Sequence, residues 1–209
     1  TGAVMEVSSH ALHQYRVHGV NFNTAVFTNL TQDHLDYHGT MEEYFNAKKI
    51  LFDNLPRSSW AVINTDDPRG KKLYDGVQSN KVSYGFHPSS DVCAADIRLS
   101  MKETTFTVLH NGEKSEIISS LVGRFNVSNL LAAFATGVAL NIPKETIVKG
   151  IQKLSSVRGR FEQIASPKGW SAVVDYAHTP DALEKTLRAI HDVFGANRTG
   201  KIITVFGCG

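Results

Sequence analysis

The sequence predicts an α/β fold with a mainly parallel central sheet flanked by helices, a small antiparallel excursion, and the start of a second Rossmann-like α/β domain. Two observations predict this fold. Short apolar runs alternate with helical patterns along most of the chain, which is typical of βαβ units. Between residues 91 and 120 this pattern gives way to residue-by-residue alternation, which is typical of half-buried antiparallel strands.

Each element of the first part has a local signal. Short apolar runs predict strands at 3–7, 24–28, 60–64 and 81–86, and alternation predicts strands at 96–100, 104–110 and 114–119. Asn111-Gly112 is a strong signal for the hairpin turn between the last two. Helices are expected at 126–140, capped by Asn126 or Ser128, and at 143–154, with Pro143 in the first turn.

A boundary in the segment 155–160 predicts two domains, residues 1–157 and 158–209. Beyond it we expect one βαβ-like unit: a strand at 171–175, a helix that begins at Thr179-Pro180-Asp181 with Thr179 as its cap, and a strand at 201–206. Apolar segments lie close to both Thr1 and Gly209. We therefore expect the sequence to be an internal fragment of a longer protein.

Composition excludes several classes of protein. The 209 residues are 42% hydrophobic, which supports a sizeable core, yet no apolar run approaches the roughly 18 residues of a membrane span. A net charge of +2 does not favour a nucleic-acid partner. Two cysteines, Cys93 and Cys208, cannot form a disulfide framework or a four-sulfur zinc site. No signal-peptide pattern opens the chain, so we expect a cytoplasmic protein.

Lys48 is anomalous on the helix that opens at Thr40 with a capping box completed by Glu43. At 100° per residue the apolar side chains of this helix form one stripe, and Lys48 falls near its middle, whereas Lys49 points to the polar side. Such a lysine has to extend its amine to solvent, find a carboxylate, or lose its proton. Two interpretations stay open: a snorkelling stem, or an amine of depressed pKa that acts as a nucleophile.

The segment after the second strand is rich in histidines and acids. His34 and His38 are four residues apart, which on a helix is a metal-ligand spacing, but Leu35 stands where a zinc hydrolase of the HExxH type has its glutamate. Glu6 ends the first strand and can approach the same region. One carboxylate and one imidazole suit Mg²⁺ assisted by substrate phosphates better than a closed zinc site. For His10, His13, His18 and His38 we expect surface or hydrogen-bonded histidines.

Six short motifs in this order closely resemble the Mur ligases of peptidoglycan synthesis, and within them the MurE type, the UDP-N-acetylmuramoyl-tripeptide synthetases. The resemblance covers essentially the whole chain. The motifs are MEVSSH at 5–10, VFTNLTQDHLDYHG at 26–39, AK at 47–48 with LF at 51–52, GRFNVSN at 123–129, RGRFE at 158–162 and DYAHTPD at 175–181.

The resemblance implies an ATP-dependent ligase that phosphorylates a substrate carboxylate and lets the amine of a diamino acid attack the acyl-phosphate. Glu6 resembles the family's Mg²⁺-binding glutamate, His34 its metal-site histidine, and Lys48 the lysine that the family carbamylates with CO₂ to N6-carboxylysine. Only a neutral amine adds CO₂, which fits the anomalous position of Lys48, and the carbamate is an anionic oxygen ligand for Mg²⁺.

Further positions match the family's binding residues. Ser8, Gln14 and Arg16 match residues that hold the UDP-MurNAc-dipeptide. Asn126 and Asn129 match its adenine-side asparagines, although helix capping would also explain Asn126. Arg160 and Asp175 resemble residues of the third domain that reach the γ-phosphate and the ribose of ATP, and His178 lies in the same motif. Domain closure would complete this site.

The sequence departs from the family in two respects. It contains no phosphate loop of the form G-x-x-G-K-[ST], and it lacks the rest of the third domain, which chooses the amino acid, as well as the N-terminal uridine-binding domain. We expect that loop upstream of Thr1 and expect the fragment itself to be inactive. Meso-diaminopimelate is favoured over L-lysine as the added amino acid, and a monomer is expected. The alternatives are an L-lysine-adding ligase of the same type and a metal-dependent hydrolase built on His34 and His38.

Overall fold

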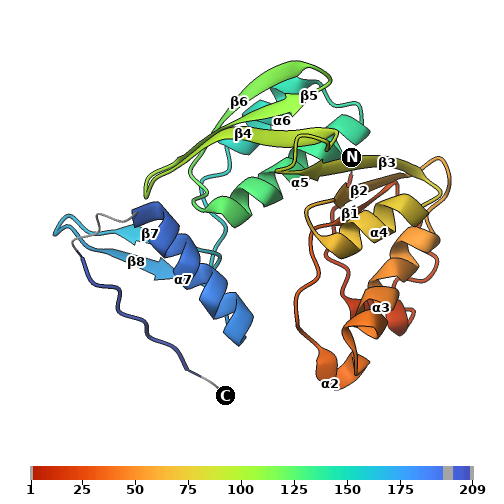
Figure 1. Cartoon of the computed structure of the whole chain (residues 1–209), viewed down its shortest axis with the longest axis horizontal. Helices are drawn as coiled ribbons and strands as arrows, with labels where there is room; N and C mark the ends of the chain where they lie inside the picture. The colour runs from red at the N-terminus through yellow and green to blue at the C-terminus, as the bar shows by residue number, and fades with distance from the viewer. Residues whose placement is uncertain (1, 195–199, 208–209) are drawn as a thin grey trace.

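The computed structural model describes residues 2–194 and 200–207, and Figure 1 shows the order of the elements. Its helices are α1 (Ser9–His13), α2 (Leu35–His38), α3 (Met41–Asp53), α4 (Pro68–Gly76), α5 (Arg124–Ala139), α6 (Lys144–Gln152) and α7 (Pro180–Phe194). Its strands are β1 (Thr24–Phe27), β2 (Trp60–Asn64), β3 (Asn80–Gly85), β4 (Val92–Leu99), β5 (Thr104–His110), β6 (Glu113–Ser119), β7 (Glu162–Ala165) and β8 (Ser171–Val174).

The main sheet has six strands in the order β1-β2-β3-β4-β5-β6. Strands β1 to β4 are parallel, and β4, β5 and β6 are antiparallel. Both residues of the turn between β5 and β6 have positive φ, 51° at Asn111 and 76° at Gly112, as a two-residue hairpin turn requires. The predicted fold class, a mainly parallel sheet flanked by helices with an antiparallel excursion, is confirmed.

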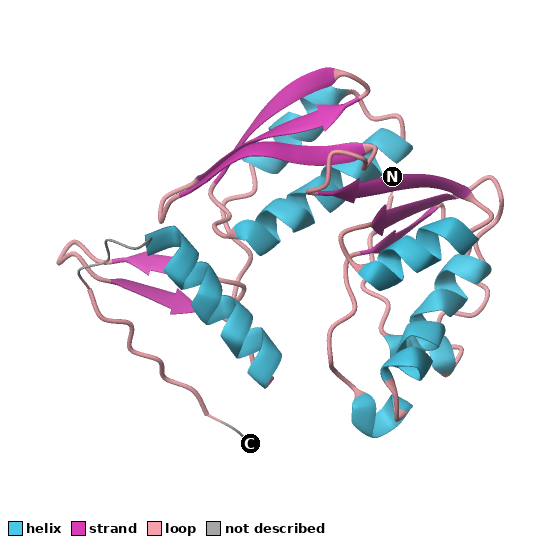
Figure 2. Ribbon diagram, in the orientation of Figure 1, coloured by secondary structure: helices cyan, strands magenta, loops and turns pink. Residues whose placement is uncertain are grey.

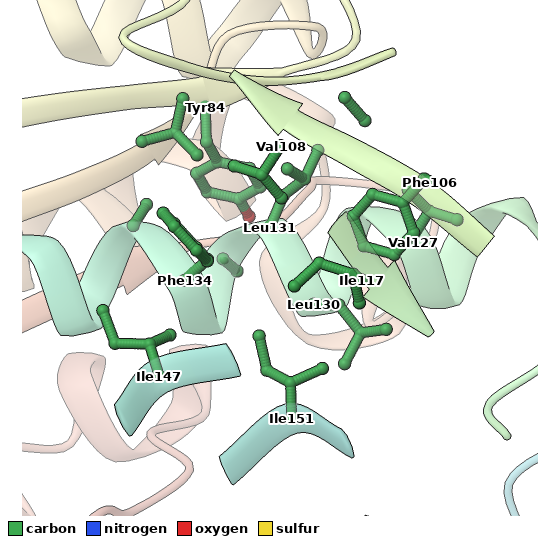
Figure 3. Close-up of a cluster of buried hydrophobic side chains, with 14 of the residues drawn as sticks. Tyr84, Phe106, Val108, Ile117, Val127, Leu130, Leu131, Phe134, Ile147 and Ile151 are labelled. Carbon is green, nitrogen blue, oxygen red and sulfur yellow. The ribbon is translucent and has the colours of Figure 1, made fainter. Parts of the chain in front are cut away.

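Both faces of the main sheet are covered by helices, so neighbouring residues of β2 can bury their side chains on opposite faces. Ala61 and Ile63 pack into a cluster with residues of α3 and α4, whereas Val62 packs into a second cluster with residues of α5 and α6. Figure 2 shows helices on both sides of the sheet. Figure 3 shows the second cluster, in which side chains from the sheet meet those of α5 and α6. Its labelled residues include Tyr84, Phe106, Ile117, Leu131, Phe134 and Ile151.

The start of α3 confirms Thr40 as its cap, but the return bond of a capping box is not formed, because the backbone N–H of Thr40 donates to the His38 oxygen at 2.9 Å. The backbone N–H of Glu43 donates to Thr40 Oγ1 at 3.1 Å, and the Thr40 hydroxyl donates to Glu43 Oε2 at 3.3 Å. The predicted caps of α5 are wrong, because α5 begins at Arg124 with Gly123 as its N-cap at φ +103°, a conformation that favours glycine. Asn126 therefore lies inside the helix.

A two-stranded antiparallel sheet, β7 and β8, and helix α7 follow the main sheet (Figure 1). Helix α7 begins at Pro180, and the N–H of Ala182 donates to the Thr179 hydroxyl at 3.3 Å, as predicted. A small cluster of Val122, Phe161 and Ala189 packs this part against the start of α5.

Two predicted strands are wrong. Residues 3–7 and 201–206 adopt no strand, and no described strand pairs with either segment. Their apolar side chains are exposed, as Val4 and Val205 illustrate. The expected βαβ-like unit is therefore an antiparallel hairpin followed by a helix. Cys93 is free and buried, and Cys208 lies outside the described residues. Among the described helices, none is long and apolar enough to cross a membrane.

Candidate active site

Histidine and tyrosine rings gather where α1, α2 and α3 meet. The ring of His10 lies 4.9 Å from that of His34 and 4.1 Å from that of Tyr37, measured between centroids. His38 stacks on Tyr44 of α3 at 5.1 Å. The cluster thus joins the loop after β1 to the helix that carries Lys48.

His38 is the buried member of this cluster, and its Nε2 is 2.9 Å from the hydroxyl oxygen of Ser9. Burial lowers the pKa of His38, and the facing charges of His10, His13, His34 and Lys48 lower it further. A second histidine, His13, is hydrogen-bonded through Nδ1 to the Tyr37 hydroxyl at 2.9 Å. These two contacts agree with the expected hydrogen-bonded histidines.

Lys48 projects from α3 over the ring of Tyr44, with Nζ 5.0 Å from the ring centroid. Burial lowers the pKa of Lys48, while the carboxylates of Glu6 and Asp33 act in the opposite direction. Its neighbour Lys49 behaves differently, because its Nζ donates to Asp53 Oδ2 at 2.6 Å. Of the two adjacent lysines, Lys48 is therefore the one whose amine is held partly desolvated near carboxylates.

The three residues predicted to surround a metal come from three segments. Glu6 is exposed on the segment before α1, and His34 is the N-cap of α2, with a left-handed backbone at φ 53°. The His34 ring lies 5.9 Å from the ring of Tyr44, which Lys48 overhangs. Asp33 accepts the backbone N–H of His34 at 2.8 Å. Glu6 and Asp33 both influence the pKa of Lys48, so the structure brings the predicted residues into one region.

The donor set of this region decides which metal fits. Within residues 2–194 and 200–207, no three His, Cys, Asp or Glu side chains form a group that could hold a metal ion. A zinc hydrolase built on His34 and His38 is not supported, because these two histidines belong to no such group among the described residues. Mg²⁺ needs only one or two protein carboxylates together with substrate phosphates, and Glu6 is such a carboxylate.

The three predicted substrate residues lie on or beside α1. Ser8 is the N-cap of α1 and accepts the N–H of Ala11 at 3.1 Å. The amide of Gln14 donates to the Tyr37 hydroxyl at 3.2 Å, and Arg16 Nη2 donates to Gln14 Oε1 at 2.5 Å. The structure therefore connects Gln14 and Arg16 to the histidine cluster through Tyr37.

Asn126 and Asn129, the two predicted adenine-side residues, lie on one side of α5 and contact each other. Asn126 is buried, and its Nδ2 donates to the backbone oxygen of Val122 at 2.8 Å. Asn129 Nδ2 donates to Asn126 Oδ1 at 3.4 Å. Asn126 thus holds the backbone at the start of α5 and orients Asn129.

The predicted residues of the second part lie around the start of α7. Asp175 accepts the backbone N–H groups of Phe161 and Ala177 at 2.7 and 2.9 Å and the Thr186 hydroxyl at 3.2 Å, so its carboxylate organises this region. The Arg160 guanidinium lies 5.0 Å from the Tyr176 ring centroid. His178 is exposed.

A cavity of about 420 Å³ lies between the loop that follows β1 and the start of α7. Gln32, Asp33, His34 and Leu35 line one side, and the start of α7 lines the other with Thr179, Pro180 and Asp181. The predicted metal-site histidine and the DYAHTPD motif therefore share one cavity, although they are far apart in sequence.

Two side chains that sequence reasoning missed hold the loop that leads to His34. Asn64 Nδ2 donates to the backbone oxygen of Thr28 at 2.7 Å, and Asp67 Oδ2 accepts the N–H of Leu30 at 2.7 Å. Asn64 is the last residue of β2 and Asp67 lies just beyond it, at the carboxyl end of the strand, where polar residues of a parallel sheet gather around ligands. That rule was the available signal for them.

Comparison with known families matches the chain in two parts. A model described as the Mur ligase middle domain matches residues 1–137. A second, described as the Mur ligase, glutamate ligase domain, matches residues 159–209.

Curated relatives and solved structures agree with these matches. The chain is 46% identical to the UDP-N-acetylmuramoyl-L-alanyl-D-glutamate–2,6-diaminopimelate ligase of Bacillus licheniformis, over 99% of the chain and 43% of the relative. It is 45% identical to the protein of the same name from Solibacter usitatus, over 100% of the chain and 42% of the relative. A solved structure with that name is 35% identical, with a TM-score of 0.74 over 88% of this chain and 38% of its own. The chain thus spans less than half the length of these relatives.

Proposed function

The chain belongs to the Mur ligase family, and on that premise we propose that it is part of an ATP-dependent ligase that adds meso-diaminopimelate to UDP-MurNAc-L-Ala-D-Glu. The relatives named for 2,6-diaminopimelate favour this amino acid over L-lysine. In this reaction the γ-phosphoryl group of ATP passes to the substrate carboxylate and ADP leaves. The amine then attacks the acyl-phosphate, and phosphate and a proton are released. Because ATP is a co-substrate, we propose a cytoplasmic location.

The observation that supports this proposal most directly is the environment of Lys48. Burial lowers its pKa, which raises the fraction of neutral amine at a given pH. The neutral amine forms a nitrogen–carbon bond with CO₂ and loses one proton, giving a carbamate. The nearby carboxylates of Glu6 and Asp33 favour the ammonium form, so the balance between burial and these two charges sets how readily Lys48 reacts.

We propose that Glu6, His34 and carbamylated Lys48 hold Mg²⁺, which when bound supplies positive charge to the phosphate oxygens. Oxygen donors and a small number of protein ligands suit this ion. Asp33 fixes the backbone of His34 through its hydrogen bond to the His34 N–H. The ring of Tyr44, which stacks on His38, lies under Lys48 Nζ and reduces the access of water to this amine.

The remaining predicted residues take binding roles in this proposal. Ser8, Gln14 and Arg16 would bind the UDP-MurNAc-dipeptide, and Arg16 suits a phosphate because its planar guanidinium donates two parallel hydrogen bonds. Asn126, Asn129, Arg160, Asp175 and His178 would bind ATP. We further propose that residues 1–157 and 158–209 belong to two domains and that the cavity between Asp33 and Asp181 lies within the reaction site.

A chimeric enzyme tests the proposed function. The chain replaces the matching segment of the Bacillus licheniformis relative, and ADP release is measured with ATP, Mg²⁺, UDP-MurNAc-dipeptide and meso-diaminopimelate. We expect ADP release that requires both substrates. Lys48→Ala should lower the rate by more than the roughly 10- to 100-fold that is typical when a partner of a metal ligand is removed. Lys49→Ala is the matched control and should retain the rate.

Two results would contradict the proposal. An unmodified chimera that folds but releases no ADP would argue against the ligase function. A Lys48→Ala chimera with full activity, with or without added bicarbonate, would argue against the role of Lys48 alone.

A further inference from the structure

The loop between β1 and α2, residues 28–34, carries Asp33 and His34. It contains no helix or strand, and His34 at its end is exposed. A loop of this kind holds a side chain in place when its backbone groups are fixed from outside. The hydrogen bonds of this loop therefore matter for the proposed metal site.

Two side chains at and just beyond the carboxyl end of β2 fix this loop at two points. The buried Asn64 side chain donates to the Thr28 oxygen at 2.7 Å and accepts the N–H of Asp66 at 3.0 Å. The Asp67 carboxylate accepts the N–H of Leu30 with Oδ2 at 2.7 Å and the N–H of Arg69 with Oδ1 at 2.8 Å. The two side chains thus link the loop to the end of β2 and to the start of α4.

The segment to which the loop is tied is itself rigid. Asp67 is the N-cap of α4, so one carboxylate both caps this helix and holds Leu30. Helix α4 packs against the end of β2 so closely that a Cβ on Gly70 would lie 1.9 Å from the backbone oxygen of Asn64. The Leu30 side chain is buried in the cluster shared with α3 and α4.

We propose that Asn64 and Asp67 are positioning residues that set the place of His34, and of Asp33 beside it, relative to Lys48 on α3. This inference rests on the proposed function for its catalytic consequence, since it assumes that His34 holds Mg²⁺. The geometric part stands on the two hydrogen bonds to Thr28 and Leu30. Loss of either bond releases the loop without touching the metal-site residues themselves.

Asp67→Ser separates the two roles of this carboxylate. Serine caps a helix as well as aspartate does, so the bond to Arg69 is kept, but its single oxygen cannot also reach Leu30. Asp66→Ser is the matched control, because Asp66 has the same charge one residue earlier and accepts the N–H of Phe86 at 2.7 Å instead of a group of the loop. Asp67→Asn, which conserves size, is used if the serine variant does not fold.

The first measurement is amide hydrogen exchange in the 209-residue chain. We expect the peptide that contains residues 28–34 to exchange at least about tenfold faster in Asp67→Ser than in the unmodified chain and in Asp66→Ser, because the Leu30 amide loses its acceptor. Equal exchange rates in the three proteins would overturn the proposal.

The second measurement is the Mg²⁺ concentration that gives half-maximal ADP release in the chimeric enzyme. We expect Asp67→Ser to raise it about 10- to 100-fold and Asp66→Ser to leave it unchanged, since a purely structural loss would lower the rate at all Mg²⁺ concentrations alike. Faster exchange with an unchanged Mg²⁺ requirement would also overturn the proposal. An inactive unmodified chimera would instead refute the proposed function, and the exchange result would still stand.

Discussion

Replacing Gly70 by alanine tests how closely α4 packs on the end of β2. A Cβ at this position would lie 1.9 Å from the Asn64 backbone oxygen and 3.2 Å from Cε1 of Phe27, and real Cβ contacts are essentially never under 3.0 Å. Because folded interiors are close-packed, α4 or β2 would have to move by about 1 Å.

The magnitude follows from two opposing contributions. Overpacking a well-packed core costs about 1–3 kcal/mol, and the upper end applies here because the clash is with backbone. Alanine in place of glycine within a helix gains about 1 kcal/mol. We therefore expect Gly70→Ala to lower the free energy of unfolding by about 2 kcal/mol, which lowers Tm by about 4–8 °C for a chain of this length.

Urea and thermal unfolding followed by circular dichroism measure this effect. Gly76→Ala in the same helix is the control, since a Cβ there would meet no atom within 4 Å, and its stability should be unchanged or slightly higher. A Gly70→Ala protein as stable as the unmodified chain would refute the reasoning, because α4 would then have room to move.

Three further predictions concern stability. The folded-state pKa of His38 is lowered, so below about pH 6.5 the unfolded chain binds a proton that the folded chain does not, and the free energy of unfolding decreases as the pH is lowered. His38→Gln should reduce this slope between pH 7 and pH 5 in urea titrations, and equal slopes would contradict the prediction. Thr40→Ala removes the hydroxyl that binds Glu43 and should cost about 1 kcal/mol, seen as a lower urea midpoint. Phe134 is fully buried, so Phe134→Ala should cost about 3–5 kcal/mol by the same measurement, and a cost below 1 kcal/mol would show that the core refills the space.

Local signals predicted those elements whose cause is local. The Thr40 cap of α3 and the hairpin turn at Asn111 and Gly112 are determined by residues within four positions of one another. Strands 3–7 and 201–206 were wrong because an apolar run gives the propensity for a strand, whereas the ladder also needs a neighbouring strand. Helix α4 was missed because its apolar pattern is weak, although Asp67 and Pro68 carry the start signal of a helix.

The residues of the candidate site likewise divide into those that a local pattern predicts and those whose position depends on contacts distant in sequence. Lys48 was predictable because its conflict with the apolar stripe is visible within one helix, and burial does lower its pKa. The contacts from Asn64 and Asp67 to the loop span 36 and 37 residues, so their partners depend on how β1 and β2 pair. The cavity shared by residues 32–35 and 179–181 depends on the arrangement of both parts of the chain. No local pattern encodes it.

The change from parallel to antiparallel pairing at β4 has a consequence for the kinetics of folding. Strands β5 and β6 are joined by a two-residue turn, so their contacts have low contact order and can form within microseconds. The pairing of β1 with β2 instead requires closure of the long connection that contains α3, at a larger cost in chain entropy. We therefore expect the antiparallel strands β4, β5 and β6 to pair early. The parallel pairing of β1 with β2, together with the loop that carries His34, should be completed late.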